Sequence, residues 1–247
     1  MTGLRSANPD RIGVVIPARD ERDHLPACLT ALDRAAAQTA VPVTLVVVLD
    51  GCTDDSAEVV ARTPLRWLNR LIVLTSSHGN VGYARDLGAR TLLAEYSKRQ
   101  LWLASSDADS TVPVDWFVRQ LRHRELGAAA VLGTVQVADW SRHSARTRRR
   151  YLRAYRPVDG HRHTHGANLA MTADSYLAVG GFPHLVAHED IGLARALIAA
   201  GQQIAWAADL PVTTSARLLA RAPTGFAHHL RLIAARERQL EPGQVTP

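Results

Sequence analysis

The sequence predicts an α/β fold in which a mostly parallel sheet is covered by helices on both faces. Two observations support this prediction. Short apolar runs of strand length alternate with segments of helical periodicity, and polar or acidic residues directly follow several of these runs. A chain of 247 residues can bury a substantial core, and α/β chains of this length are often one domain. We therefore expect a single α/β domain.

The first half of the chain contains four strand-like runs separated by helical patterns. The runs span residues 12–16, 44–49, 71–75 and 101–106. The first helical pattern follows Asp20, which we expect to be its N-cap. The next helix is expected to open at residues 53–56, and the third to carry residues 84–92.

The second half is less regular. A helix is expected at residues 116–126, a strand at 128–137, another helix at 191–200 and a short strand at 204–207. Between them lies a densely basic stretch from Arg142 to Arg156, followed by His161, His163 and His165. Alternating histidines can bind a metal ion, but in a polar loop they are more often solvated.

Composition indicates an ordinary globular protein, with 47% hydrophobic and 21% charged residues. No apolar run approaches the roughly 20 residues that span a bilayer. The start of the chain is polar, and the two cysteines lack the spacing of a metal site or a disulfide scaffold. We expect a cytoplasmic protein.

The chain is basic, with a net charge of +6 and a sequence pI near 10.0. This balance favours anionic partners without naming one. Lys98 is the only lysine, so arginine carries nearly all of the positive charge. Arginine binds phosphate and carboxylate groups bidentately, although a GC-rich genome would produce the same bias without any function.

Two acids follow the fourth strand-like run. Asp107 and Asp109 are two residues apart, so in an extended segment both face the same way. Open α/β sheets bind ligands at the carboxyl ends of their strands. Paired carboxylates there suit Mg²⁺ or Mn²⁺ bound together with phosphate oxygens. The alternative is a strand that ends in a polar turn.

Other polar residues are expected at the same edge of the sheet. Glu21, Asp50 and Arg85 each follow one of the first three strand-like runs. Each also has a local explanation, respectively the first turn of a helix, a turn before glycine, and a solvated helix face. No glycine-rich G-x-G-x-x-G loop or P-loop follows the first run, which argues against a dinucleotide or P-loop enzyme.

Several short motifs, each weak by itself, occur in order along the chain. They read Val14-Val15-Ile16-Pro17-Ala18-Arg19-Asp20-Glu21, Leu49-Asp50-Gly51-Cys52-Thr53-Asp54, Gly79-Asn80-Val81-Gly82-Tyr83-Ala84-Arg85, Asp107-Ala108-Asp109, Gly180-Gly181-Phe182 and Glu189-Asp190. Together they resemble the family 2 glycosyltransferases of GT-A fold over about residues 12–208. Asp20, Leu49 and Gly192 depart from the residues that the family usually has at those positions.

The resemblance implies an α/β GT-A-type single domain over residues 1–247, with a mostly parallel central sheet flanked by helices. A Rossmann-like nucleotide-sugar-binding half would span about residues 10–110. An acceptor-binding and catalytic half would span about 111–230, and the termini would be short and flexible. The implied reaction moves a sugar from a nucleotide-diphosphate sugar to an acceptor hydroxyl. It uses a divalent metal, Mn²⁺ or Mg²⁺, and usually inverts the anomeric carbon by direct displacement.

The resemblance also assigns roles to individual positions. It places the nucleoside against Pro17, Ala18, Arg19, Glu21 and Asp50, with Gly82 and Arg85 beside it. Asp107 would contact the ribose side, and Asp109 would bind the metal that bridges the diphosphate. Asp190 would be the general base that takes the proton from the acceptor hydroxyl, with Glu189 beside it.

Two other functions remain open from the sequence. One is a nucleotidyltransferase on a related α/β fold, and the other is a non-catalytic nucleotide-binding or nucleic-acid-binding protein. We expect no nucleic acid partner, because Tyr151 and Tyr155 are the only aromatic residues in the arginine-rich stretch. The acceptor is unknown and could be a glycan, a lipid-linked molecule or a small molecule.

The arginine-rich stretch itself is expected to be a mobile loop or a helix on the acceptor side. Its dense like charges repel one another, so we expect the stretch to become ordered when an anionic donor or acceptor binds. An alternative is attraction to anionic lipid headgroups, which would place the protein at the inner face of the membrane.

Overall fold

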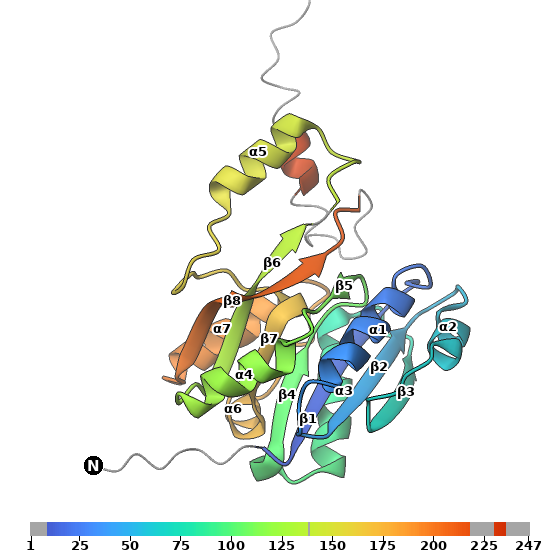
Figure 1. Cartoon of the computed structure of the whole chain (residues 1–247), viewed down its shortest axis with the longest axis vertical. Helices are drawn as coiled ribbons and strands as arrows, with labels where there is room; N and C mark the ends of the chain where they lie inside the picture. The colour runs from blue at the N-terminus through green and yellow to red at the C-terminus, as the bar shows by residue number, and fades with distance from the viewer. Residues whose placement is uncertain (1–8, 138, 218–229, 236–247) are drawn as a thin grey trace, which may run out of the picture.

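A computed structural model describes residues 9–137, 139–217 and 230–235. The short flexible termini expected from the sequence lie outside these ranges. One sheet of eight strands forms the centre of the molecule, in the order β3-β2-β1-β4-β7-β6-β8-β5 (Figure 1). The predicted α/β class with a mostly parallel sheet is confirmed, because β1 pairs in parallel with β2 and β4, β2 with β3, and β6 with β8.

The first half builds a parallel βαβ array. Its elements are β1 (Arg11–Ala18), α1 (Leu25–Ala36), β2 (Val43–Asp50), α2 (Ser56–Arg62), β3 (Arg70–Ser76), α3 (Val81–Glu95), η1 (Lys98–Gln100) and β4 (Leu101–Ser105). Every residue of β2 is buried, as expected for a strand covered by helices on both faces. The carboxyl ends of β1, β2 and β4 therefore lie side by side.

The second half extends the same sheet with antiparallel pairs. Its elements are β5 (Ser110–Thr111), α4 (Trp116–Glu125), β6 (Ala130–Val137), α5 (Ala145–Ala154), η2 (Gly166–Asn168), β7 (Leu169–Thr172), α6 (Ala173–Ala178), α7 (Glu189–Ala199) and β8 (Ile204–Thr214). The short strand β7 runs antiparallel to both β4 and β6, and so joins the two halves. It was not expected from the sequence.

Two apolar layers cover the sheet, one on each face. Helices α1, α2 and α4 pack on one face, with Leu29, Trp116 and Phe117 among the buried residues. Helices α3, α6 and α7 pack on the other, with Leu92 and Tyr176. Among the residues that the structure describes, no helix has the length and apolar character needed to cross a bilayer.

The expected N-cap at Asp20 is wrong. Helix α1 starts at Leu25, after His24, whose side chain makes no capping bond. Asp20 has φ 51°, and its Oδ1 accepts the N–H of Thr53 at 2.7 Å. The side chain thus holds the loop after β2 instead of its own helix, a contact over 33 residues that helical periodicity does not report.

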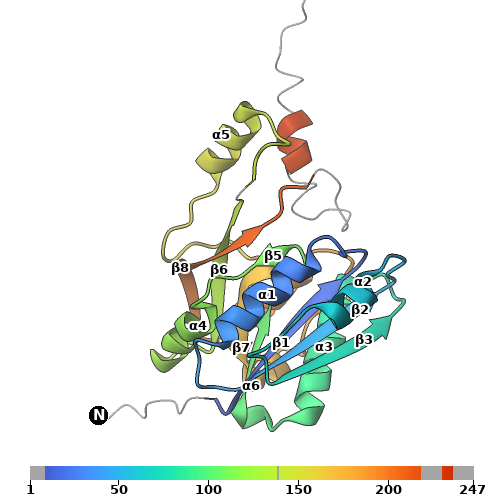
Figure 2. The same ribbon diagram turned by 45° about the vertical axis from the view of Figure 1, so that its right-hand side comes forward.

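A smaller apolar cluster lies beyond the end of the sheet. Tyr151 of α5 packs there with Ala216, Leu230 and Ile233. Figure 2 shows α5 and the helical segment at residues 230–235 beside each other and away from the central sheet. The arginine-rich stretch therefore contains a helix, one of the two forms expected for it.

Candidate functional site

A cavity of about 660 Å³ lies at the carboxyl ends of β1, β2 and β4 and reaches to α5. Its wall comes from both halves of the chain. All but one of the site residues predicted from the sequence line it, namely Pro17, Ala18, Arg19, Glu21, Asp50, Arg85, Asp107, Asp109, Glu189 and Asp190. Acids that follow separate strands in the sequence thus share one volume.

Gly82 is the predicted site residue outside the cavity wall. A Cβ atom there would lie 2.1 Å from the carbonyl oxygen of Pro183. The N–H of Gly82 donates to the carbonyl of Leu185 at 3.0 Å. The missing side chain lets the start of α3 pack tightly against the segment before α7.

Arg85 is a buried guanidinium that joins the two halves of the site. Its Nε donates to Glu189 Oε1 at 2.9 Å, and its Nη2 donates to the carboxylate of Asp107. Nη1 donates to the hydroxyl of Ser105 and, at 3.1 Å, to the carbonyl of Ser106. Burial by itself lowers the pKa of Arg85, but the two carboxylates raise it above its ordinary value. A buried charge with this many partners holds them in one arrangement.

Gly166 lets Arg85 pass close to the backbone. A Cβ atom at this position would lie 2.4 Å from Arg85 Nη2. The N–H of Gly166 donates to Asp190 Oδ2 at 2.8 Å. Two residues later, Asn168 Nδ2 donates to the carbonyl of Thr134 at 2.8 Å, which anchors this turn to β6. Gly166 was not predicted as a site residue.

Asp190 is a carboxylate whose pKa lies close to neutrality. It stands in the first turn of α7, and its Oδ1 accepts the N–H of Ile191 at 2.7 Å. Burial, and then the neighbouring Glu189, raise the pKa of Asp190 to about 6, against the opposing effect of Arg85 and the backbone donors. Glu189 differs from it, because its carboxylate is paired with Arg85.

Asp50 positions the loop that leads into α3. Its Oδ1 accepts the N–H of Gly79 at 3.1 Å, and its Oδ2 accepts the N–H of Asn80 at 2.7 Å. Asn80 then caps α3 by accepting the N–H of Tyr83 at 3.0 Å. Asp50 is buried and lines the cavity, so it both holds this loop in place and forms part of the cavity wall.

Asp109 and Glu21 meet at a guanidinium that the sequence reasoning missed. Arg217, just after β8, places Nη2 3.1 Å from Asp109 Oδ2, and its Nη1 donates to Glu21 Oε1. Burial raises the pKa of Asp109 to about 6; Arg217 opposes this rise, while Asp107 and Glu21 add to it. A lone arginine after an apolar strand gives no sequence signal, since its partners are far away along the chain.

The donor set at Asp109 fits a divalent cation held together with a diphosphate. Mg²⁺ and Mn²⁺ are typically bound by one or two carboxylates with phosphate oxygens supplying further ligands. Asp109 is a half-buried carboxylate in the cavity wall with a raised pKa, so a cation beside it would stabilise its charged form. Asp107 contributes less, because its Oδ1 is paired with Arg85.

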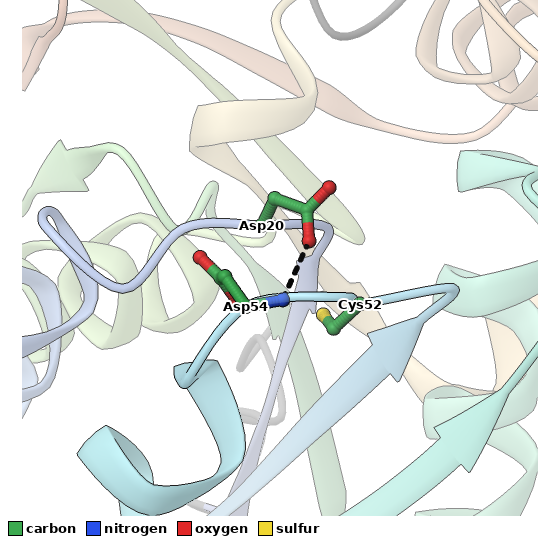
Figure 3. Close-up of side chains that lie close together, drawn as sticks. All are labelled: Asp20, Cys52 and Asp54. Carbon is green, nitrogen blue, oxygen red and sulfur yellow. Dashed lines mark hydrogen bonds between the residues drawn. The ribbon is translucent and has the colours of Figure 1, made fainter.

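Within the described ranges, the one group with three converging metal-ligand atoms is Asp20, Cys52 and Asp54, drawn in Figure 3. Its oxygens already accept backbone N–H groups. Asp20 Oδ1 accepts from Thr53 at 2.7 Å, and Asp54 Oδ1 accepts from Ser56 at 3.0 Å. The group therefore ties two loops together, and its geometry is explained without a metal.

The three alternating histidines do not form such a group. They stack in a row, with ring centroids 5.5 Å apart for His161 and His163 and 6.2 Å for His163 and His165. Burial lowers the pKa of His165 to about 4, and its Nε2 lies 3.0 Å from Tyr155 Oη. Beneath α5, the cavity wall includes Tyr151, Tyr155, His163 and His165, whereas His161 lies outside it.

Comparisons with known proteins agree with this geometry. The sequence matches the model of glycosyl transferase family 2 over residues 13–179. Among curated proteins, no sequence match to this chain was found.

Three solved structures illustrate the likeness of fold. TarS from S. aureus, in complex with UDP-GlcNAc, has a TM-score of 0.64 and 13% identity, over 95% of this chain and 68% of that one. Mannosyltransferase PcManGT from Pyrobaculum calidifontis, in complex with GDP-Man and Mn²⁺, has a TM-score of 0.57 and 18% identity, over 98% and 67%. GalNAc-T7, with UDP, GalNAc and Mn²⁺, has a TM-score of 0.61 and 14% identity, over 85% and 44%. The chain spans 41% of a longer TarS structure.

The family model covers more than half of the chain and includes most of β1, Asp50, Arg85 and the Asp107–Asp109 pair. At this low identity, the solved structures establish the GT-A fold. The chain belongs to glycosyltransferase family 2 and is a glycosyltransferase.

Proposed function

We propose that the protein transfers a sugar from a nucleoside diphosphate sugar to an acceptor hydroxyl, with Asp190 as the general base. The observation that carries this proposal is the position of two carboxylates with pKa values of about 6, Asp109 and Asp190, in the wall of one cavity. A base with a pKa near the working pH has the greatest catalytic effect. Asp190 can therefore take the proton from a hydroxyl, while Asp109 in the same cavity can hold a cation beside the departing diphosphate.

The donor would lie over the first half of the chain, at about residues 10–110. Pro17, Ala18 and Arg19 form the rim at the end of β1 and would contact the nucleoside together with Glu21 and Asp50. Arg19 is exposed and can turn toward an anionic ligand, whereas Asp50 is held by the loop before α3. Cocrystallised nucleotide sugars in TarS and PcManGT support a donor of this class.

The diphosphate would lie between Asp109 and Arg217. A divalent cation bound at Asp109, Mn²⁺ or Mg²⁺, would neutralise the charge that develops on the leaving nucleoside diphosphate. Arg217 already contributes positive charge to this side of the cavity through its contacts with Asp109 and Glu21. Asp107 would face the ribose side, where Arg85 fixes its Oδ1. Mn²⁺ in two of the similar structures supports the metal.

The acceptor would enter from the second half, at about residues 111–230. Asp190 accepts two backbone N–H groups, which orient its carboxylate, while Glu189 is bound to Arg85. We therefore assign proton removal to Asp190 and positioning to Glu189. A base acting on a hydroxyl that attacks the anomeric carbon directly gives inversion in a single displacement.

Product analysis with a panel of nucleotide sugars tests the proposal. The panel is first screened with Mn²⁺ by thermal shift, because a ligand that binds the folded protein raises its melting temperature. Any donor that binds is then incubated with candidate acceptors or water. Release of a nucleoside diphosphate supports glycosyl transfer, whereas release of pyrophosphate would identify a nucleotidyltransferase and overturn the proposal.

A further inference from the structure

The cavity does not account for the most strongly charged part of the molecule. Between Arg142 and Arg156 the chain has seven arginines and no acidic residue, which exceeds the net charge of +6 for the whole chain. In the described part of the chain, none of these arginines lines the cavity, and none forms an ion pair. Within the described residues, they therefore contribute neither to the cavity wall nor to a salt bridge.

Helix α5 displays these charges on its solvent side. Five of its ten residues are arginines, and only Thr147 and Tyr151 are buried. Several arginines stand three or four positions apart, such as Arg149 and Arg153, where like charges repel and destabilise a helix. The helix is held by its inner face, because Tyr151 packs against Trp140 with ring centroids 5.3 Å apart and against residues 230 and 233.

We propose that α5 is a docking surface for an anionic membrane. This inference rests on the proposed function, because it names the partner that the acceptor side of the site would face. Arginines spread around an exposed helix cannot converge on one small anion, but they match an extended layer of negative headgroups. Leu152 is 53% exposed among them and is suited to enter the headgroup region.

A nucleic acid fits the same surface less well. Single strands are bound by exposed aromatic rings that stack on bases, in addition to positive charge. Here Tyr151 is buried, and Tyr155 is stacked on His163 with centroids 4.2 Å apart. Both tyrosines point to the cavity, so docking at the outer face of α5 would leave the acceptor side of the site next to the membrane.

Vesicle co-sedimentation of the full chain tests this proposal. Vesicles of phosphatidylcholine with about 30% phosphatidylglycerol are compared with phosphatidylcholine alone, at about 50 mM and about 500 mM salt. We expect binding to the anionic vesicles at low salt and release at high salt, because salt screens exposed charges. Absence of binding to anionic vesicles at low salt would overturn the proposal.

A triple variant, Arg148→Gln/Arg149→Gln/Arg153→Gln, locates the surface. Binding is expected to weaken on the order of 100-fold, since each basic residue near an anionic surface contributes about fivefold. The matched control, Arg34→Gln/Arg122→Gln/Arg195→Gln, removes the same charge from exposed positions on other helices and should weaken binding far less. Equal losses in both variants would mean that net charge, and not α5, binds the vesicle.

Two further measurements separate this proposal from its alternatives. A single-stranded oligonucleotide that displaces the protein from vesicles at stoichiometric concentration would assign α5 to nucleic acid and refute membrane docking. Nucleoside diphosphate binding, measured by calorimetry, should be unchanged in the triple variant on α5, because the three substituted arginines lie outside the cavity. Loss of vesicle binding with retained nucleotide binding shows that the variant is folded and supports α5. If the wild-type protein binds the nucleotide but not the vesicles, membrane docking is refuted and the proposed function is not.

Discussion

Asp190→Asn should slow the reaction and stabilise the fold at the same time. The side chain keeps its shape but loses the proton acceptor, so turnover should fall by about 10² to 10⁴. The folded pKa of about 6 lies above the ordinary value of 3.8, so ionising Asp190 in the folded protein is unfavourable. Two pKa units correspond to at most about 3 kcal/mol.

The sign of this stability effect depends on pH. Below pH 3.8 the carboxyl group is protonated in both the folded and the unfolded chain, so the variant gains nothing there. As pH rises through about 6, the wild type loses stability and the variant does not. The amide can accept only one of the two backbone N–H groups, which costs about 1 kcal/mol. Partial exposure of Asp190 reduces the stability gain of the variant further. A gain of about 1 kcal/mol would raise the melting temperature by roughly 2 to 4 °C.

The assay combines nucleoside diphosphate release with thermal unfolding across pH. For the wild type, kcat/KM should rise about tenfold from pH 5 to 7 around a midpoint near 6, and the residual rate of the variant should lack this rise. Asp174→Asn is the matched control, since Asp174 stands in the first turn of α6, exposed and outside the cavity. The assignment of the base is refuted if Glu189→Gln abolishes transfer while Asp190→Asn retains most of it.

Three further predictions concern other residues. Asp109→Asn should weaken metal-dependent binding of a nucleoside diphosphate in calorimetry without lowering the melting temperature, and unchanged Mn²⁺ dependence would contradict the metal assignment. Gly166→Ala puts a methyl group 2.4 Å from Arg85 Nη2, so we expect a lower melting temperature and slower turnover; wild-type values for both would show that the turn relaxes freely. Asp33→Ala leaves the N–H groups of residues 66–68 without the Oδ1 atom that they share, and should lower the free energy of unfolding in urea by about 2 to 4 kcal/mol. Asp33→Asn keeps that oxygen and should lose much less.

Local patterns along the chain predicted the fold class and ten of the residues that line the cavity. Apolar runs and helical periodicity are local properties, so they predicted β1 to β4, α4 and α7 within a few residues of their observed bounds. Parallel strands bring their carboxyl ends to one edge of the sheet. For this reason, Asp50, Asp107 and Asp109 could be placed together from the sequence. The same local reasoning failed at β7, whose four residues are too few to show a period.

The arrangement of the charges in the site depends on the packing of distant segments. Arg85 meets Glu189 across 104 residues, and Arg217 meets Glu21 across 196, and no local pattern records such pairs. The raised pKa of Asp190 follows from burial, which depends on how α7 packs beside the turn at Gly166. Sequence spacing shows which residues can face the same volume. Burial and long-range pairing then determine which carboxylate carries a structural charge and which remains available for chemistry.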